Sequence, residues 1–247
     1  RELGIEPSER AARAALLESR SGARFPFVIF CAAPSKSGDK YPDEVAEAAA
    51  ECWAGRAGGE LEGEGEGSSG FIFTSSGSVY AEDAGGIVRE TSPLTDAPRA
   101  MRLLNAETHV LEAGGSVVRL AGLYAATRGA HAYWLKQEEL PGNGAGIVNQ
   151  LHYNDAAGVA VAGLQTKQNR GKVWLASDDE PLTRAAIVDA AIASHLFAER
   201  EGPAPVFVGE GGPMGKVYDT SATREELGWM PEYPSFAAFM ALDPTPE

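Results

Sequence analysis

The chain has 247 residues, of which 44% are hydrophobic and 23% charged, a composition typical of a soluble globular protein with a sizeable core. Its 35 acidic residues outnumber its 21 basic residues, and the formal net charge of −14 argues against a nucleic-acid partner, which would need clustered Lys and Arg. Apolar runs of the roughly 20 residues that a membrane helix requires do not occur, so we expect no membrane-spanning helix.

Helices and strands are predicted to alternate along the first half of the chain. The apolar run FPFVIFCAAP favours a strand buried on both faces. Pro in the first turn of one predicted helix, and two glycines after the end of another, are typical helix boundaries. The predicted elements are helix 7–19, strand 25–34, helix 41–55, strand 70–76, helix 97–115 and strand 116–122.

The second half continues the alternation less regularly. Strands alternating with helices indicate parallel pairing, because a parallel crossover needs about a dozen residues or more. We therefore predict an α/β fold with a mostly parallel sheet. The predicted elements are strand 146–153, helix 154–165, strand 171–177, helix 181–199, strand 204–209 and helices 221–229 and 235–242.

Two glycine-rich stretches have spacings that resemble phosphate-binding turns. The first, within 55–70, follows a helix and leads into a strand, which is the reverse of a phosphate turn, and its glutamates would repel a phosphate. We expect a mobile acidic surface loop there. The second, GEGGPMGK at 209–216, follows a strand but precedes no amphipathic helix, so a turn is favoured, and contact of Lys216 with an anion is the alternative.

The two cysteines, Cys31 and Cys52, lie in an apolar run and an Ala-rich run. Neither has a Cys or His at metal-ligand spacing, so we predict no metal site and expect both to be reduced, small core residues. Reduced thiols are typical of an intracellular protein.

Small hydroxyl residues follow the predicted strand 70–76 in the stretch FIFTSSGSVY. The carboxyl ends of parallel strands are where open α/β sheets bind ligands, so Thr74, Ser75 and Ser76 point to a site. A strand end that is simply capped by hydroxyls is the alternative, and these residues alone leave both interpretations open.

Five motifs in order resemble the extended short-chain dehydrogenase/reductases, and more narrowly their atypical NAD(P)-dependent epimerase/dehydratase-like branch of bacteria, algae and plants. The resemblance covers nearly the whole chain from FVIFCAAP onward. It implies a Rossmann-type sheet with a smaller C-terminal α+β lobe and the substrate between them. The motifs are FIFTSSGSVY, ETSPLTD (90–96), SVVRLAGLY (116–124), NQLHYND (149–155) and REELGWMPEYPSF (224–236).

The resemblance also implies roles for individual residues. Ser76 matches the catalytic serine that orients the substrate oxygen, and Tyr124 ends the strand that leads to the nicotinamide and substrate region. His152 and Asp155 match an H-x-x-D motif that ties the second lobe to the sheet. The residues implied to line the site of NAD or NADP are Ala32, Ala33, Pro34, Thr74 and Ser75.

The beginning of the chain departs from the family pattern, which opens with a strand, a glycine-rich turn, a helix and a second strand. RELGIEPSER resembles the stretch after that second strand, so about 50 residues of a family member are expected to be absent and the sheet to be N-terminally incomplete. The chain would then be a piece of a longer protein, which we favour, or a partner would fill the gap. NAD or NADP binding is expected only if the missing segment exists.

A second departure concerns the family's Tyr general acid and the Lys four residues later. None of the seven tyrosines here is followed at that spacing by a Lys. Aligning on the tripeptide NAE puts Arg99 in place of the Tyr and Leu103 in place of the Lys. Arg is a poor proton donor because its pKa exceeds about 12, and Leu supplies no charge. The standard catalytic relay is therefore not expected.

The segment GLYAATRGAHAYWLK (122–136) carries the residues that could replace it. Arg128 and Tyr133 are candidates for binding a substrate, and Tyr124 or His131 for transferring a proton. A solvated loop followed by a packing helix is the alternative.

Two functions therefore remain open. One is an NAD(P)-binding, epimerase/dehydratase-like protein that takes a nucleotide and a sugar-like or carbonyl ligand. The other is a non-catalytic scaffold or accessory subunit with protein partners in a larger assembly. We expect residues 1–122 to form a partial NAD(P)-binding domain and 123–247 to mix substrate-lobe segments with the last sheet strands. The expected location is intracellular and soluble, in the cytoplasm or a plastid stroma.

Overall fold

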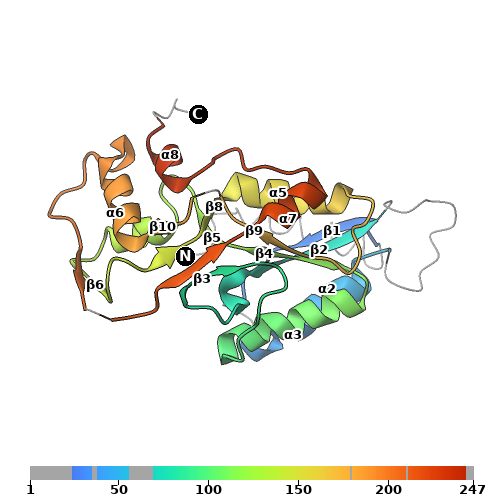
Figure 1. Ribbon diagram of the computed structural model, residues 1–247. Coiled ribbons are helices and arrows are strands. Elements are labelled where there is room, and N and C mark those ends of the chain that lie inside the picture. The colour runs from blue at the N-terminus through green and yellow to red at the C-terminus, as the bar shows by residue number, and fades with distance from the viewer. Residues whose placement is uncertain (1–23, 35–37, 56–68, 179, 210, 243–247) are drawn as a thin grey trace, which may run out of the picture.

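A parallel four-stranded sheet forms the centre of the structure, a computed structural model that describes residues 24–34, 38–55, 69–178, 180–209 and 211–242 (Figure 1). The strand order is β1-β2-β4-β9. The expected helix 7–19 and most of the loop 55–70 lie outside the described residues. The sheet confirms the predicted α/β class with a Rossmann-type parallel arrangement.

The register of this sheet brings the carboxyl ends of its strands to one edge. The strands are β1 (Phe27–Phe30), β2 (Gly70–Ser76), β4 (Ser116–Leu120) and β9 (Val173–Ala176), and all pairs are parallel. Ser76 lies opposite Leu120, and Leu120 lies opposite Ala176. The hydroxyl residues that end β2 therefore meet the ends of their neighbours.

Helices cover both faces of the sheet (Figure 1). α2 (Tyr41–Glu51) and α3 (Pro98–Glu112) lie on one side, and α5 (Tyr153–Gln165) and α7 (Ser221–Leu227) on the other. Because side chains alternate along a strand, Phe71 and Phe73 of β2 pack toward α2 and α3, whereas Ile72 packs with α5. The result is a three-layer sandwich with a separate core on each side of the sheet.

The prediction that β1 is buried on both faces is wrong. Phe27 is 46% exposed and Ile29 is 36% exposed, while Val28 and Phe30 pack against the core under α2. β1 pairs only with β2, and within the described residues no strand pairs with its outer edge. It is therefore an edge strand with one covered face.

The prediction that both cysteines are core residues is also wrong. Cys31 and Cys52 are free thiols, and both are exposed. Cys31 follows the last residue of β1, where the chain leaves the sheet edge, and Cys52 caps the C-terminus of α2 at the surface. An apolar or Ala-rich neighbourhood in sequence did not make these positions internal, because both lie where an element ends.

Short strands and helices beyond the carboxyl end of the sheet form a second lobe, built mostly from the C-terminal half of the chain (Figure 1). Several of these elements were not predicted, because strands of two to five residues leave little periodicity to detect. One sheet contains β10 (Leu182–Thr183), β7 (Ile147–Val148), β12 (Gly215–Tyr218) and β3 (Ala84–Val88) in that order, and two smaller sheets pair β6 (Glu139–Pro141) with β11 (Val206–Val208) and β5 (Gly122–Tyr124) with β8 (Gln150–His152).

The helices of this lobe are short. The predicted helix 181–199 starts later than expected, because Thr183 caps it by accepting a hydrogen bond from the backbone N–H of Ala186 at 3.1 Å. No helix in the described part of the chain is long and apolar enough to cross a bilayer. The remaining helical elements are α4 (Ala130–Trp134), α6 (Arg184–Ala193), α8 (Phe236–Met240) and the 3-10 turns η1 (Gly38–Lys40), η2 (Gly77–Val79) and η3 (His195–Phe197).

Candidate functional site

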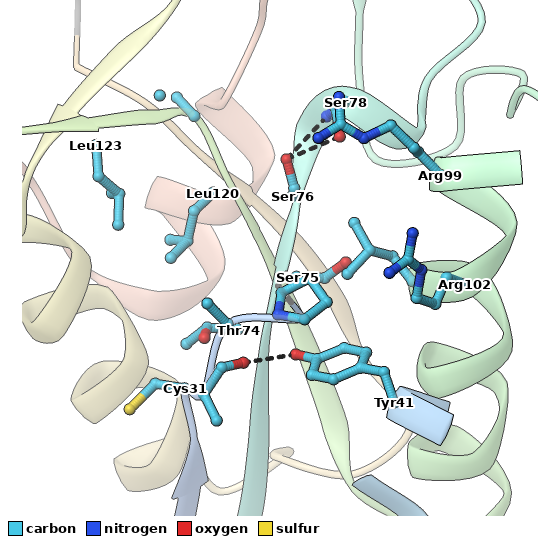
Figure 2. A pocket seen from close by; sticks show the side chains of 16 residues that line it. Cys31, Tyr41, Thr74, Ser75, Ser76, Ser78, Arg99, Arg102, Leu120 and Leu123 are labelled. Carbon is cyan, nitrogen blue, oxygen red and sulfur yellow. Dashed lines mark hydrogen bonds between the residues drawn. The ribbon is translucent and has the colours of Figure 1, made fainter. Parts of the chain in front are cut away.

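A pocket of about 600 Å³ lies at the carboxyl ends of β1, β2 and β4, within the size range of small-molecule sites (Figure 2). Five segments line it: the loop 31–34 after β1, Tyr41 at the start of α2, the hydroxyl-rich end of β2 with the turn after it, the first turns of α3, and the chain from Leu120 to Leu123. We call it the strand-end pocket. The fold places it at the edge where parallel sheets bind ligands.

Tyr41 fixes the loop that forms one wall of the pocket. Its hydroxyl donates a hydrogen bond of 2.7 Å to the carbonyl of Ala32 (Figure 2). Its ring packs beside those of Phe30 and Phe73. Burial raises the pKa of Tyr41 to about 12, with smaller contributions from Glu44 and Cys31. This tyrosine therefore stays protonated at neutral pH and positions backbone rather than supplying a proton.

The three hydroxyl residues at the end of β2 differ in how they are bound. Thr74 Oγ1 donates to the carbonyl of Phe30 at 3.3 Å, and Ser75 Oγ donates to Glu107 at 2.5 Å. Ser76 Oγ accepts from the backbone N–H of Ser78 at 3.2 Å and donates to its hydroxyl at 3.0 Å. Ser76 and Ser78 thus present a pair of adjacent hydroxyls at the pocket, while Thr74 and Ser75 are engaged by the protein.

A buried ion pair supports the sheet beneath these hydroxyls. Arg119 of β4 donates to both carboxylate oxygens of Glu107 on α3, with a shortest distance of 2.7 Å, and its guanidinium lies 4.9 Å from the ring centre of Tyr80. Both side chains of the pair are at most 6% exposed. Because Ser75 donates to the same carboxylate, the network joins β2, β4 and α3 where the pocket wall begins.

One face of α3 forms the opposite wall. Arg99, Arg102 and Leu103 all line the pocket, and their spacing of three and four residues places them on one side of the helix. Figure 2 shows the side chains of Arg99 and Arg102 running from α3 toward the end of β2. These include the two positions that align with the family's Tyr and Lys, which are occupied here by Arg99 and Leu103.

Six of the ten predicted site residues come together in the strand-end pocket. They are Ala32, Ala33, Pro34, Thr74, Ser75 and Ser76. Their contact with a ligand remains a prediction. The other four, all in the segment 122–136, do not line this pocket.

Tyr124 lies in a cluster of aromatic rings on the lobe side, which we call the aromatic cluster and which contains Tyr124, His131, His152, Tyr233, Phe236 and Phe239. Its neighbour Leu123 lines the pocket, and because side chains alternate along β5, Tyr124 points the other way. Tyr124 is fully buried, and burial raises the pKa of its hydroxyl. A catalytic role for Tyr124 stays a prediction that this geometry does not favour.

His131 also belongs to the aromatic cluster. It is fully buried, with its ring centre 4.9 Å from that of Phe236 and its Nε2 3.1 Å from the carbonyl of Ala126. Burial lowers its pKa, so the ring is neutral at physiological pH. Arg128 stacks over Tyr153 at 4.7 Å, and Tyr133 is 64% exposed. The roles predicted for these residues are not tested by the structure.

The H-x-x-D motif joins the C-terminal segment to the rest of the fold. Asp155 is buried and accepts backbone hydrogen bonds from Glu232 at 2.7 Å and Tyr233 at 3.2 Å. His152 packs its ring 4.3 Å from that of Tyr233 and 4.6 Å from that of Phe239. Both residues therefore hold the lobe in place, as the resemblance implies.

Three pocket residues were missed at the sequence level, and each carried a signal. Tyr41 starts a helix just after the loop 31–34, so the two had to be close. Arg102 lies one turn after Arg99, which the alignment had already placed at the site. Ser78 lies two residues after Ser76 within the same motif. Gly209 and residues 211–214 form a loop, in agreement with the prediction, whereas Gly215 and Lys216 begin strand β12. Lys216 donates to the carbonyl of Tyr80 at 2.6 Å and does not line this pocket.

The solved structures that share this fold include the following three. A functionally unknown conserved protein from Silicibacter pomeroyi has a TM-score of 0.63 at 23% identity, covering 97% of this chain and 79% of that one. A dTDP-glucose 4,6-dehydratase from Bacillus anthracis in complex with NAD has a TM-score of 0.67 at 15% identity, covering 93% and 74%. A UDP-glucuronic acid 4-epimerase from Bacillus cereus in complex with UDP-glucuronic acid and NAD has a TM-score of 0.65 at 18% identity, covering 92% and 75%.

The chain matches no family model and no curated protein sequence. At these identities the likenesses establish the fold alone, which this chain shares with the dTDP-glucose 4,6-dehydratase and the UDP-glucuronic acid 4-epimerase. The fold-level resemblance inferred from the five motifs is thereby confirmed. Within the described residues, no three His, Cys, Asp or Glu side chains gather as they would around a metal ion.

Proposed function

We propose that this chain is an NAD(P)-binding, epimerase/dehydratase-like protein whose strand-end pocket holds the nicotinamide side of the cofactor and a small second ligand, without the standard Tyr/Lys relay. The observation that carries the proposal is the meeting of the loop 31–34, the end of β2 and α3 around one pocket. The dehydratase and epimerase structures that share this fold are both complexes with NAD.

The residues present fit part of a dinucleotide. Ala32 and Ala33 are small and exposed beside Thr74, so a flat ring or ribose can approach the backbone closely. The described residues include no glycine-rich turn between a strand and a helix on which a pyrophosphate would rest. The described pocket therefore supports the nicotinamide–ribose half of the cofactor.

The chemistry available to the pocket residues is binding and polarisation. The hydroxyl of Ser76 can donate a hydrogen bond to a ligand oxygen if it turns away from Ser78. Tyr41 is held to the Ala32 carbonyl with a pKa of about 12, so it does not supply a general acid near pH 7. When bound, NAD(P) would accept or donate hydride, and any turnover would be slow.

The loss of the relay also favours the second candidate function, a non-catalytic scaffold or accessory subunit. Leu103 occupies the Lys position and cannot supply its charge. Such a protein would keep the fold and the packing of the pocket wall. It would have no dependence on a bound dinucleotide.

Titration with NAD(H) and NADP(H), followed by the midpoint of thermal unfolding, separates these functions. A ligand that binds the native state raises the free energy of unfolding by about 2.7 kcal/mol at a hundredfold excess over its Kd. We expect the midpoint to rise with at least one dinucleotide. No rise with any of them at millimolar concentration would contradict the proposal and leave the scaffold function.

A further inference from the structure

Two arginines give the strand-end pocket a charge opposite to that of the chain. The formal net charge of the protein is −14, yet the described residues that line this pocket include no carboxylate. Arg99 and Arg102 are its charged lining residues in the described part of the chain. The local field at the pocket therefore favours an anion.

The donors of these two side chains are almost unused. Within the described residues, Arg99 makes no hydrogen bond or ion pair, and Arg102 makes one long contact of 3.5 Å to the carbonyl of Gly38. Arginines elsewhere are engaged, such as Arg119 with Glu107 at 2.7 Å and Arg89 with Asp219 at 2.8 Å. The N–H donors of two planar guanidinium groups thus face the cavity, and few protein acceptors occupy them.

The position of these arginines is not explained by helix stability. Arg99 is the second residue of α3, whose N-cap, Ala97, makes no side-chain hydrogen bond and whose first turn contains no acidic residue. A positive charge near a helix N-terminus opposes the helix dipole and is unfavourable. An anion in the pocket would offset both the dipole and the two guanidinium groups.

From these observations we propose that Arg99 and Arg102 bind an oxyanion of the pocket's ligand, a carboxylate or a phosphate, with the hydroxyls of Ser76 and Ser78 as additional donors. The inference rests on the proposed function, because it takes the strand-end pocket as the ligand site. Guanidinium groups pair with carboxylate and phosphate in two-point geometry. At the positions on α3 that align with the family's proton relay, this chain recognises charge instead. Its ligand is a small molecule that bears an acidic group.

Isothermal titration calorimetry with matched probes tests the inference. UDP-glucuronic acid and UDP-glucose differ by one carboxylate, and pyrophosphate supplies phosphate oxygens alone. We expect Arg99→Gln and Arg102→Gln each to weaken the binding of the preferred anionic probe by roughly tenfold to a hundredfold, the loss of a charge-assisted hydrogen bond. Arg24→Gln removes the same charge at an exposed position outside the pocket and should leave the affinity unchanged.

The probes also identify the source of the oxyanion. A preference for UDP-glucuronic acid that disappears in the arginine variants assigns the site to a carboxylate. Equal binding of both UDP sugars and of pyrophosphate, lost in the same variants, assigns it to a phosphate. Unchanged affinities in Arg99→Gln and Arg102→Gln, or no binding of any anionic probe at millimolar concentration, would overturn the inference.

Titrating NADH into the same proteins separates this inference from the proposed function. If wild type binds NADH and the variants bind it equally well while losing the anionic probe, both proposals stand and the oxyanion belongs to the second ligand. If wild type binds the anionic probe in an arginine-dependent way but no dinucleotide, the charge site stands and the cofactor proposal fails. If wild type binds NADH, and both arginine variants bind the anionic probe as tightly as wild type does, the cofactor proposal stands and the charge site fails.

Discussion

The strand-end pocket and the aromatic cluster lie on opposite sides of the same short strand, β5, and both contain polar side chains that sequence motifs marked as functional. In the pocket, Ser76 faces a cavity. In the cluster, Tyr124 and His131 are fully buried among rings. The difference shows that a polar residue at a strand end marks a site only if its side chain points toward the cavity. Because side chains alternate along β5, a step of one residue reverses that direction.

Different forces stabilise the two regions. Packing of aromatic rings stabilises the cluster, whereas a buried ion pair between Glu107 and Arg119 supports the wall of the pocket. Substitutions in the cluster should therefore change stability and leave ligand affinity intact. Substitutions among the side chains that face the pocket should do the reverse.

The largest effect is expected in the aromatic cluster. Phe236→Ala removes a fully buried ring that contacts Tyr124 and His131, and should lower the free energy of unfolding by about 3–5 kcal/mol in urea titrations. Phe25→Ala, at a position that is 40% exposed, is the matched control and should cost much less. Tyr124→Phe should preserve both stability and NADH affinity, and a large loss of affinity would show that Tyr124 acts at the pocket after all.

Breaking the ion pair beneath the pocket should have the next largest effect. Glu107→Gln leaves Arg119 buried without a countercharge, which should reduce the free energy of unfolding by about 3 kcal/mol or more. Glu112→Gln, on the same helix with a side chain 72% exposed, should change it by less than about 0.5 kcal/mol. Equal changes in the free energy of unfolding for the two substitutions, measured in urea titrations, would show that the buried ion pair does not stabilise the fold.

The two regions should also respond differently to acid. Burial lowers the pKa of both His131 and His152 below the ordinary value near 6.5, so the folded protein holds them neutral while the unfolded chain accepts protons first. Their contribution to stability is present above about pH 6.5 and is lost as the pH falls below that value toward the folded pKa. We therefore expect the free energy of unfolding to decrease from pH 7 to pH 5.

Two variants isolate this contribution. His131→Phe should flatten part of the slope, whereas replacing the exposed His109 with Gln should not. No His lines the strand-end pocket, so the NADH affinity of the folded protein should stay nearly constant between pH 6 and pH 8. The separation of the aromatic cluster from the ligand site would be contradicted by two results together. These are a steep pH dependence of NADH affinity, and an unchanged slope of the free energy of unfolding against pH in His131→Phe.

The smallest expected effect is on stability at the pocket itself. Arg99→Gln removes a positive charge from the first turn of α3, where it opposes the helix dipole, and should raise the free energy of unfolding by up to about 1 kcal/mol. A ligand-free variant that is at least as stable as wild type, but binds its anionic probe less well, is typical of a residue placed for function. A destabilisation above about 1 kcal/mol would indicate a structural role for Arg99 instead.

The sequence predicted the central sheet well, because long strands and helices leave a clear pattern. Strand 70–76 and the parallel order of its neighbours follow from continuous apolar runs separated by helices. The short strands β6 and β10 were not predicted, since two or three residues carry no period. The exposed face of β1 could not be foreseen either, because an apolar run does not show which neighbours cover it.

The candidate site was predicted in part, for reasons that can be traced to single residues. Strand order alone places Ser76 and the loop 31–34 together, because both follow the carboxyl ends of adjacent parallel strands. The direction of Tyr124 depends on the register of β5 with β8, which is a tertiary property. The contribution of Arg102 depends on how α3 is rotated against the sheet, and its spacing from Arg99 was the only hint.

Selective labelling of one cysteine tests most directly whether the strand-end pocket is the ligand site. Cys31 lines this pocket, whereas Cys52 is equally free and exposed but does not line it and serves as an internal reference. Alkylation of the full chain by iodoacetamide, followed by mass spectrometry with increasing NADH, should show Cys31 progressively protected and Cys52 unchanged. Binding of NADH that leaves both thiols reacting at their original rates would contradict the account.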